Sequence, residues 1–432
     1  MILVFVLVLA VVLAILGTAH WYVWRRLVRD TTAPGSPWRR AGTVVFVAGP
    51  VLAVGALAGE QAGLPHAAAR VVAWPGYLWL ALLLYLFLGV VAGEVVRPLL
   101  SRWLASRRDG VRAGVNASGE MVSAGMSGGV AGGTGDDGRD GGNGSAAGGA
   151  PEGVPAKVLS RRVFVSRIAG GAAAAAALGT VGAGAFGVLN GPSVKRITVP
   201  LAKLPRSAHG LRIAVVSDVH LGPILGADFC RRVVDTINGT QPDLIAVVGD
   251  LIDGDVADLA GSVEPLRGLR SRMGTFFVTG NHEYISGVEP WVAKVRELGM
   301  QPMRNTRVEL PGFDLAGVDD IAGEDDGAGP DFGAALGDRD PSRASVLLSH
   351  QPVTIHQAVE HGVDLQLSGH THGGQMWPGN YIAELANPTN AGLERYGDTQ
   401  LYVSRGAGAW GPPVRVGAPS DITVVELASR QA

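Results

Sequence analysis

The sequence is poor in cysteine and in charge. Its 432 residues include one cysteine, Cys230, and charged residues make up 17%. A single thiol excludes an internal disulfide framework. It indicates little about the compartment, because many exported proteins contain no disulfide. The low charge accompanies a hydrophobic content of 47%, which is high for a soluble enzyme and points to membrane segments.

The net charge of −2 hides a difference between two parts of the chain. Residues 1–194 have 16 Lys/Arg against 9 Asp/Glu, whereas residues 195–432 have 20 against 29. A basic, apolar first part is typical of membrane anchoring with cationic flanks. The acidic second part lacks the basic surface that binds a phosphate backbone, so we expect no nucleic-acid partner.

Long apolar runs occupy the first part. They are Ile2–Trp24, Thr43–Gly59, Val71–Gly93 and, rich in Ala and Gly, Ile168–Leu189. The first and third have the roughly 20 residues that a bilayer span needs, while the second is marginal and contains Pro50. We therefore predict a membrane domain with three transmembrane helices in residues 1–108, and a fourth such helix within residues 158–190.

Residues 109–157 separate these helices and consist of Gly, Ser, Ala and scattered charges. Without apolar periodicity this segment is predicted to be a flexible linker. The next segment begins with Arg161-Arg162, followed by apolar residues and a moderately hydrophobic run. It resembles a twin-arginine export signal. The alternative is a positive flank beside an ordinary span.

The distribution of arginine predicts the orientation. The loops after the first and third runs contain several arginines, whereas the loop after the second contains only Arg70. Arginine-rich loops stay in the cytoplasm, which places the N-terminus outside and the linker inside. The fourth helix then exits. We expect a multi-pass protein of the cell membrane whose domain of residues 191–432 is extracytoplasmic.

Residues 191–432 have the pattern of an α/β domain. Short apolar runs rich in β-branched residues predict strands at Leu211–Ser217, Leu244–Val248, Thr275–Thr279, Phe313–Val318, Ser345–Ser349, Leu365–Ser368, Leu401–Ser404 and Ile422–Leu427. Segments of helical length lie between several of them, for example Ala227–Asn238 and Glu289–Leu298.

Polar residues suited to metal binding follow five of these strands. They are Asp218 and His220, Asp250, the run Asn281-His282-Glu283, His350, and finally His370 and His372. Ligands collect beyond the carboxyl ends of strands in α/β sheets, so these side chains are expected to meet. Carboxylate, imidazole and amide groups bind divalent Mn, Fe or Zn. Each element alone is common, but all five in this order indicate a metal site.

In these motifs the chain resembles the calcineurin-like metallophosphoesterase superfamily, and within it a membrane-associated bacterial branch. The resemblance covers about Ile197–Leu427 and includes Tyr402–Gly406 and Trp410–Pro413. It implies an α/β fold with four layers, a β-sandwich flanked by helices. It also implies metal-dependent hydrolysis of a phosphomonoester or phosphodiester.

The resemblance also implies a set of ligands for two divalent metal ions, Mn, Fe or Zn. The first ion would be bound by Asp218, His220 and His372, the second by Asn281, His350 and His370, and Asp250 would bridge them. His282 matches a histidine that contacts the phosphoryl oxygen or the leaving group. Two such cations activate a water for in-line attack on phosphorus.

The substrate class stays open at this point. A lipid headgroup or another phosphate of the cell envelope would suit the expected location. A nuclease or cyclic-nucleotide phosphodiesterase is an alternative, and so is a membrane scaffold or sensor that only binds a ligand. The oligomeric state is not predicted. Two acidic stretches, Asp319-Asp320 and Glu324–Asp326, are expected to lie in a solvated loop.

Overall fold

A computed structural model describes residues 2–59, 64–124 and 161–431. These residues form two compact units. One unit combines residues 1–43 with 86–175, and the other combines residues 44–85 with 176–432. Residues 109–124, predicted as part of the linker of residues 109–157, belong to helix α3, which extends to Ala124. The rest of that prediction lies outside the described residues.

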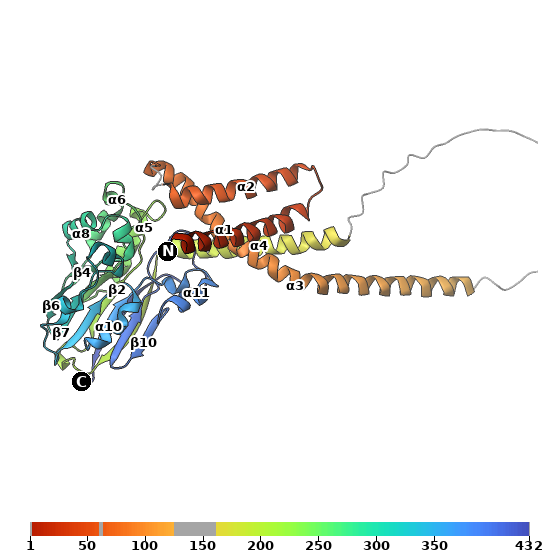
Figure 1. Cartoon of the computed structure of the whole chain (residues 1–432). Coiled ribbons are helices and arrows are strands. Elements are labelled where there is room, and N and C mark those ends of the chain that lie inside the picture. Colours follow the sequence, from red (N-terminus) through yellow and green to blue (C-terminus); the bar gives the residue numbers. More distant parts are fainter. Residues whose placement is uncertain (1, 60–63, 125–160, 432) are drawn as a thin grey trace, which may run out of the picture. The chain divides into compact units, whose positions relative to one another are not determined.

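Four long helices contain the predicted apolar runs (Figure 1). They are α1 (Ile2–Trp24), α2 (Pro37–Ala58), α3 (His66–Ala124) and α4 (Arg161–Leu189). Within the described residues, three segments are long and apolar enough to cross a membrane: Pro37–Ala58, Ala67–Val96 and Val163–Leu189. Helix α1 matches the first predicted run residue for residue. Arg161 and Arg162, the pair in the export-like motif, begin α4.

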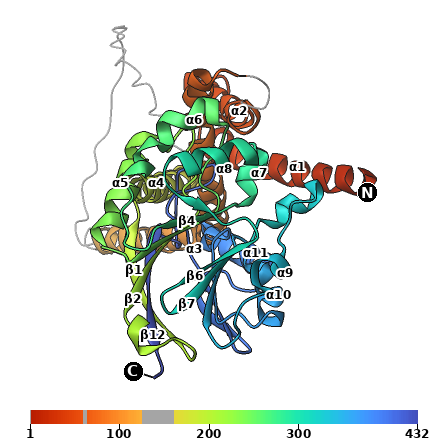
Figure 2. The same cartoon turned by 90° about the vertical axis from the view of Figure 1, so that its left-hand side faces the viewer.

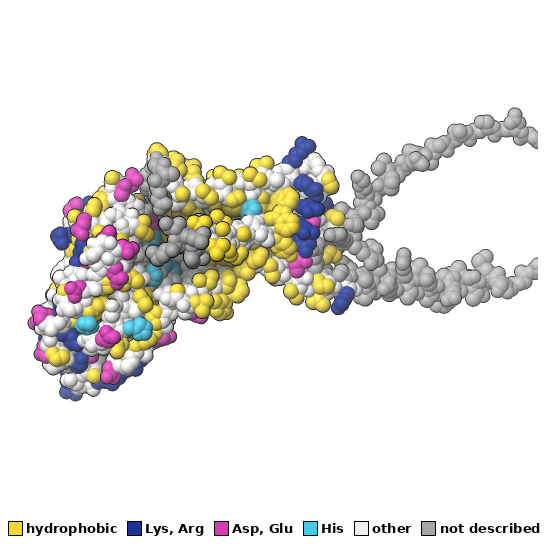
Figure 3. All heavy atoms as spheres, viewed as in Figure 1, with side chains coloured by type: hydrophobic (Ala, Val, Ile, Leu, Met, Phe, Trp, Pro, Cys, Tyr) yellow, Lys and Arg dark blue, Asp and Glu magenta, His cyan; other side chains and the backbone are white. Residues whose placement is uncertain are grey.

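In the first unit, arginines gather where α1 ends. The short π-helix Arg25–Arg29 follows α1, and Arg26 forms ion pairs with Asp30 and, 3.0 Å away, with Glu94 of α3. Figure 3 shows dark blue side chains collected at this end of the helices, and yellow ones along them. Basic residues beside apolar helices are the pattern that flanks membrane spans.

In the second unit, α2 and α3 pack through small residues. A Cβ atom on Gly49 would lie 2.1 Å from the Trp79 ring, and one on Gly76 would lie 2.3 Å from the Leu52 carbonyl oxygen. Such close approach is typical of helices that associate in a membrane. The Tyr77 hydroxyl adds a hydrogen bond of 3.0 Å to the Ala56 carbonyl oxygen.

The rest of the second unit is a sandwich of two six-stranded mixed sheets (Figure 2). The first has the order β1 (Ser193–Leu201), β12 (Asp421–Ser429), β2 (Leu211–Val216), β3 (Leu244–Val248), β4 (Thr275–Val278), β5 (Gln301–Pro302). The second has the order β10 (Gly392–Tyr396), β11 (Thr399–Val403), β9 (Leu365–Ser368), β8 (Ala344–Leu348), β7 (Phe313–Gly317), β6 (Thr306–Leu310).

Three apolar clusters hold the layers together. Ile213, Leu315 and Val346 belong to the cluster that joins the two sheets. A second cluster packs the first sheet against α5 (Ala227–Gly239), α6 (Val256–Val263) and α8 (Val288–Glu297), and a third packs the other sheet against α9 (Phe332–Leu336) and α10 (Ile355–Glu360). The four-layer α/β sandwich predicted for this domain is confirmed.

All eight predicted strands are present, with ends that differ by two residues at most. The four strands that were not predicted, β1, β5, β6 and β10, are the edge strands of the two sheets. Central strands are buried on both faces and read as continuous apolar runs, whereas edge strands are partly exposed. The exposed residues in β6 and β10 break the apolar pattern.

Trp291 of α8 connects this core to the loop after β3. Its side chain is fully buried, and its indole N–H donates a 3.0 Å hydrogen bond to the Gly254 carbonyl oxygen. We predict that Trp291→Ala destabilises the domain by about 3–5 kcal/mol, because it leaves a cavity. The thermal midpoint of near-UV circular dichroism should fall by on the order of 10 °C. Val353→Ala, at a 41% exposed position, should leave it nearly unchanged; equal midpoints for both variants would contradict the prediction.

Candidate metal centre

The side chains predicted to bind metal lie at one end of the sandwich. Asp218 and His220 follow β2, Asp250 follows β3, and Asn281 and His282 begin the short helix α7 (Asn281–Ile285) after β4. The second sheet contributes His350 after β8, and His370 with His372 after β9. Both sheets therefore supply ligands, and the structure brings all eight predicted site residues together.

Asp218, His220 and His372 form one candidate ligand group, with one ligand atom of each within 4.8 Å of the others. The Nε2 atoms of His220 and His372 are 3.0 Å apart, and the His372 Nε2 atom is 3.5 Å from Asp218 Oδ1. All three residues are buried. Two imidazole nitrogens and a carboxylate oxygen that converge in this way suit a divalent cation.

Asp250, His350 and His370 form another candidate group. The His350 Nε2 atom is 3.2 Å from Asp250 Oδ2, and the His370 Nδ1 atom is 3.0 Å from the Asn281 amide oxygen. Asp250 Oδ2 also lies 3.8 Å from the Nε2 atom of His220, which belongs to the first group. The Asp250 carboxylate is thus positioned between the two groups.

Hydrogen bonds orient two of the histidines toward a cation. The Nδ1 atom of His350 is 2.8 Å from the Val248 carbonyl oxygen. A carbonyl oxygen only accepts, so Nδ1 carries the proton, and in the neutral ring the Nε2 atom has a free lone pair. That Nε2 atom is buried and makes no well-aligned hydrogen bond among the described residues, although Asp250 Oδ2 lies 3.2 Å away. The Nδ1 atom of His220 lies 2.8 Å from the Asp253 carboxylate, to which it can only donate, so the Nε2 atom of the neutral His220 ring also has a free lone pair. The residues present therefore fit a metal ion.

His282 also points into this site. Its Nδ1 atom is 2.7 Å from Asp253 Oδ1, and its Nε2 atom is 4.0 Å from Asp250 Oδ2. With His220 and Asp250 it makes a third candidate ligand group. The geometry is compatible with contact to a cation as well as to a substrate oxygen, so the role suggested by the resemblance stays a prediction.

Three further residues, none of them among the predicted ligands, support the site. The buried Glu283 carboxylate accepts hydrogen bonds from the backbone N–H groups of Gly280, Asp250 and Leu251. The buried Arg415 guanidinium contacts both the Nδ1 atom and the carbonyl oxygen of His372. The Asp253 carboxylate lies 2.8 Å from the Nδ1 atom of His220 and 2.7 Å from the Nδ1 atom of His282. The sequence contains a local indication of the role of Glu283, because it stands three residues after Gly280. It contains no such indication for Arg415.

The backbone at the site is unusual. Asp218, His220, Asp250, His370 and His372 all have φ between 48° and 72°, a region that residues other than glycine rarely adopt. Glycines permit the close approach of neighbouring segments. A Cβ atom on Gly280 would lie 2.2 Å from Asp250 Oδ1, and one on Gly369 would lie 2.4 Å from Asp218 Oδ2. Strained conformations of this kind gather at functional sites.

Charge interactions shift the pKa values of these groups in opposite directions. Burial disfavours ionisation of Asp253, but the charges of His220 and His282 and their hydrogen bonds outweigh it and lower the pKa of Asp253 to about 2. Burial also disfavours protonated His220, yet the neighbouring Asp253, Asp250 and Asp218 raise its pKa to about 9. Burial, followed by the nearby charge of Asp250, raises the pKa of Glu283 to about 7.

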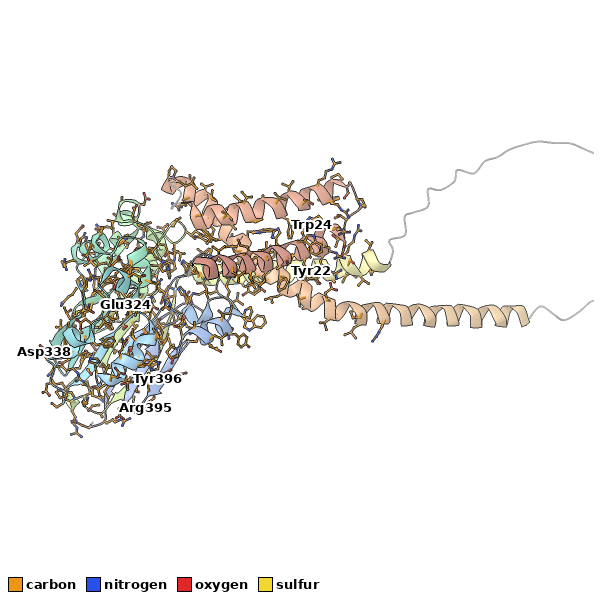
Figure 4. All side chains as sticks on the ribbon, in the orientation of Figure 1. Tyr22, Trp24, Glu324, Asp338, Arg395 and Tyr396 are labelled. Carbon is orange, nitrogen blue, oxygen red and sulfur yellow. The ribbon has the colours of Figure 1, made fainter. Side chains whose placement is uncertain are left out.

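The acidic stretches that were expected to be solvated differ from each other. The expectation was wrong for Asp319 and Asp320, which are buried. Asp319 pairs with Arg304 at 2.9 Å, and Asp320 accepts a hydrogen bond from Gln351. Burial raises the pKa of both carboxyl groups, and Asp320 Oδ2 is buried without a hydrogen-bond partner among the described residues. Glu324, marked in Figure 4, is exposed as expected on the 3-10 helix Ile321–Asp326.

Comparison with known proteins agrees with this site. Residues 211–374 match the family model of the calcineurin-like phosphoesterases. An uncharacterized metallophosphoesterase of Helicobacter pylori is 39% identical over 255 residues, which cover 58% of this chain and 68% of that protein. A Bos taurus transmembrane protein with metallophosphoesterase domain is 39% identical over 261 residues, covering 56% of this chain and 59% of that protein. The uncharacterized metallophosphoesterase YkuE of Bacillus subtilis is 32% identical over 287 residues, covering 63% of this chain and 99% of that protein.

The chain therefore belongs to the calcineurin-like phosphoesterase family and is a hydrolase of phosphoester bonds. The part matched to the Bos taurus protein is less than two thirds of that protein's length. The metal-binding residue groups and the apolar helices agree with a membrane-associated metallophosphoesterase.

Protons and cations compete for the same nitrogen atoms here, which makes metal binding depend on pH. Burial opposes protonation of both rings, but the nearby carboxylates outweigh it: they raise the pKa of His220 to about 9 and also raise the pKa of His350, so a cation competes with protons for these nitrogen atoms. His370, whose pKa burial and His350 lower to about 4, is already neutral. We predict that affinity for Mn²⁺ rises between pH 7 and 8.5, up to about tenfold per pH unit for each proton displaced.

Isothermal titration of the full chain in detergent at several pH values measures this effect. Titrations in buffers of different ionisation enthalpy count the protons released. His361→Ala, a change at an exposed position, serves as the control and should leave the pH dependence unchanged. An affinity that stays constant across this range would contradict the prediction.

Proposed function

We propose that this chain is a membrane-anchored phosphoesterase that binds two divalent cations and acts at the outer face of the cell membrane. Its substrate would be a phosphomonoester or phosphodiester. The observation that supports the dinuclear site best is the position of Asp250. Its carboxylate oxygen Oδ2 is 3.2 Å from His350 Nε2 in one ligand group and 3.8 Å from His220 Nε2 in the other.

In this proposal each ligand group holds one cation. Asp218, His220 and His372 hold the first, Asn281, His350 and His370 hold the second, and Asp250 is shared. When bound, a pair of cations activates water as a nucleophile and offsets charge on the phosphoryl oxygens. Mn, Fe and Zn all match this mixed set of carboxylate, imidazole and amide donors.

The other residues position the reacting groups. Asp253 accepts from the Nδ1 atoms of both His220 and His282, so it fixes the rings relative to each other. The Nε2 atom of His282 then faces the site, where a proton on it would stabilise negative charge on a phosphoryl oxygen or leaving group. Glu283 holds the Asp250 loop through two backbone N–H groups.

The roles assigned to Asp250 and His282 predict different effects of their substitution on metal content and rate. Chelation should abolish hydrolysis of 4-nitrophenyl phosphate or its bis-ester, and Mn²⁺ or Zn²⁺ should restore it. Among the ligand substitutions, Asp250→Asn should be the most damaging, because it weakens the binding of both cations. His282→Ala should keep the metals and lose about 10²–10³-fold in kcat, because only charge stabilisation is removed. Metal content by mass spectrometry and steady-state rates on the same samples measure both effects.

His361→Ala is a matched control on an exposed histidine and should keep wild-type metal content and rate. If folded His282→Ala lost its metals, His282 would be a ligand instead. Full activity in protein verified to be free of metal would overturn the two-cation mechanism.

The outer-face location rests on the arginine distribution and on the export-like Arg161-Arg162 pair. We predict that a fluorescent reporter that folds only in the cytoplasm, fused after Ala432, stays dark, while an exported phosphatase reporter there is active. Replacing Arg161 and Arg162 by lysine should block export if the twin-arginine route is used. Unchanged export of that variant would point to the general secretory route. A bright cytoplasmic reporter would overturn the location and favour a nuclease or nucleotide phosphodiesterase.

A further inference from the structure

A pocket in the second unit connects the metal centre with the apolar helices. Its lining includes His220 and Asp253 of the site, and Ala56, Ala69, Ala73 and Tyr77 of α2 and α3. The loop after β2 adds Pro223, Ile224 and Leu225. The cavity volume is about 60 Å³, which is smaller than the roughly 300–1,000 Å³ of sites that enclose a whole small molecule. The pocket therefore has room only for the first few CH₂ groups of a chain, and the rest of such a chain would lie outside it.

The lining of this pocket combines two kinds of residue. The His220 ring and the Asp253 carboxylate are polar, and both belong to the metal centre. Alanines, a tyrosine ring and the side chains of Ile224 and Leu225 are also part of the lining. An apolar lining with a few polar groups fits a ligand that is itself apolar with one polar end.

The apolar lining comes from segments that suit a bilayer. Ala56 lies near the end of the candidate span Pro37–Ala58, and Ala69, Ala73 and Tyr77 lie in the first turns of the candidate span Ala67–Val96. A hydrocarbon chain in this pocket would thus contact the same helices that contact lipid. Each CH₂ group of such a chain that leaves water for this apolar lining favours binding.

An exposed tryptophan lies beside the metal centre. Trp410, 55% exposed, packs edge-on against His282 with ring centroids 5.9 Å apart, and it stands between the pocket residues Ala409 and Gly411. Gln375 holds this loop, because its side-chain amide donates to the Trp410 and Pro412 carbonyl oxygens and accepts from the Trp410 N–H. Trp410 is therefore a fixed apolar surface beside the reacting groups.

Helix α11 (Gly379–Ala386) presents a further exposed apolar surface. It has no buried residue, and Tyr381, Ile382 and Leu385 are 59%, 72% and 89% exposed. The preceding Trp377 accepts a 3.0 Å hydrogen bond at its carbonyl oxygen from the hydroxyl of Tyr85, a residue of the candidate span Ala67–Val96. Exposed apolar residues fixed to a membrane helix are typical of a surface that enters the lipid interface.

From these observations we infer that the substrate is an amphiphile, a phosphoester attached to a hydrocarbon chain, which reaches the metal centre from the bilayer. The first CH₂ groups of its chain occupy the pocket lined by Ala69, Ala73 and Ile224, and its phosphoryl group lies beside His282. This inference rests on the proposed function, since it assigns a substrate class to the same site.

Two series of synthetic esters test the inference on the full chain in mixed detergent micelles with Mn²⁺. One series is alkyl 4-nitrophenyl phosphate and the other is alkyl phosphate, each with ethyl, butyl, octyl and dodecyl chains. We expect kcat/KM to rise at least 100-fold from ethyl to dodecyl in the series that is hydrolysed. A kcat/KM that does not depend on chain length would overturn the inference and leave the phosphoesterase function standing, with a water-soluble substrate. No hydrolysis of either series would instead overturn the proposed function.

Substitutions of residues that line the pocket test whether the dependence of kcat/KM on chain length arises there. Ile224→Asn puts an amide of similar size into the apolar lining, and Ala73→Phe fills the space. Both should lower kcat/KM for the dodecyl ester at least tenfold, mainly through KM, while the ethyl ester is hydrolysed as by the wild type. Val353→Asn, an exposed position outside the pocket, is the matched control for the amide. Equal losses for both esters, or no loss for the dodecyl ester in folded Ile224→Asn, would contradict the pocket assignment.

Discussion

Asp250 places a carboxylate that is almost fully buried among imidazole rings from both sheets. Oδ2 lies within 4.0 Å of nitrogen atoms of His220, His282 and His350, and Oδ1 accepts from the His282 backbone N–H. An isolated ion in such a place would cost several kcal/mol. Burial opposes its charge, but His350 and the other histidines outweigh burial and hold the pKa of Asp250 far below its usual value.

That interaction explains why two sheets are needed. Asp250 follows β3 of the first sheet, whereas His350 and His370 follow β8 and β9 of the second. The rings meet the carboxylate only because the apolar cluster between the sheets, with Ile213 and Leu315 among its members, holds the two carboxyl-end edges together. Packing in the middle of the sandwich therefore determines distances at its end.

The sequence was informative where burial is complete. Central strands such as β3 and β8 are continuous apolar runs, so their ends and the polar residues beyond them could be predicted. Edge strands such as β10 are partly exposed and have no such pattern. Glu283 and Arg415 support the site through contacts that depend on folding: Arg415 reaches His372 from 43 residues away. The burial of Asp319 could not be predicted, because its partner, Arg304, lies on another segment.

The strained backbone sets a further condition on stability. A non-glycine residue with positive φ costs on the order of 1–3 kcal/mol, and five site residues have this conformation. Together these costs are comparable with the whole stability of an ordinary domain, about 5–15 kcal/mol. The burial of the three apolar clusters must therefore contribute enough free energy of folding to offset these backbone costs as well. Ligands that bind the native site add to that stability by mass action. The strand ends around Asp218 and Asp250 are consequently the place where loss of cations would loosen the domain first, while the sheet interior stays packed.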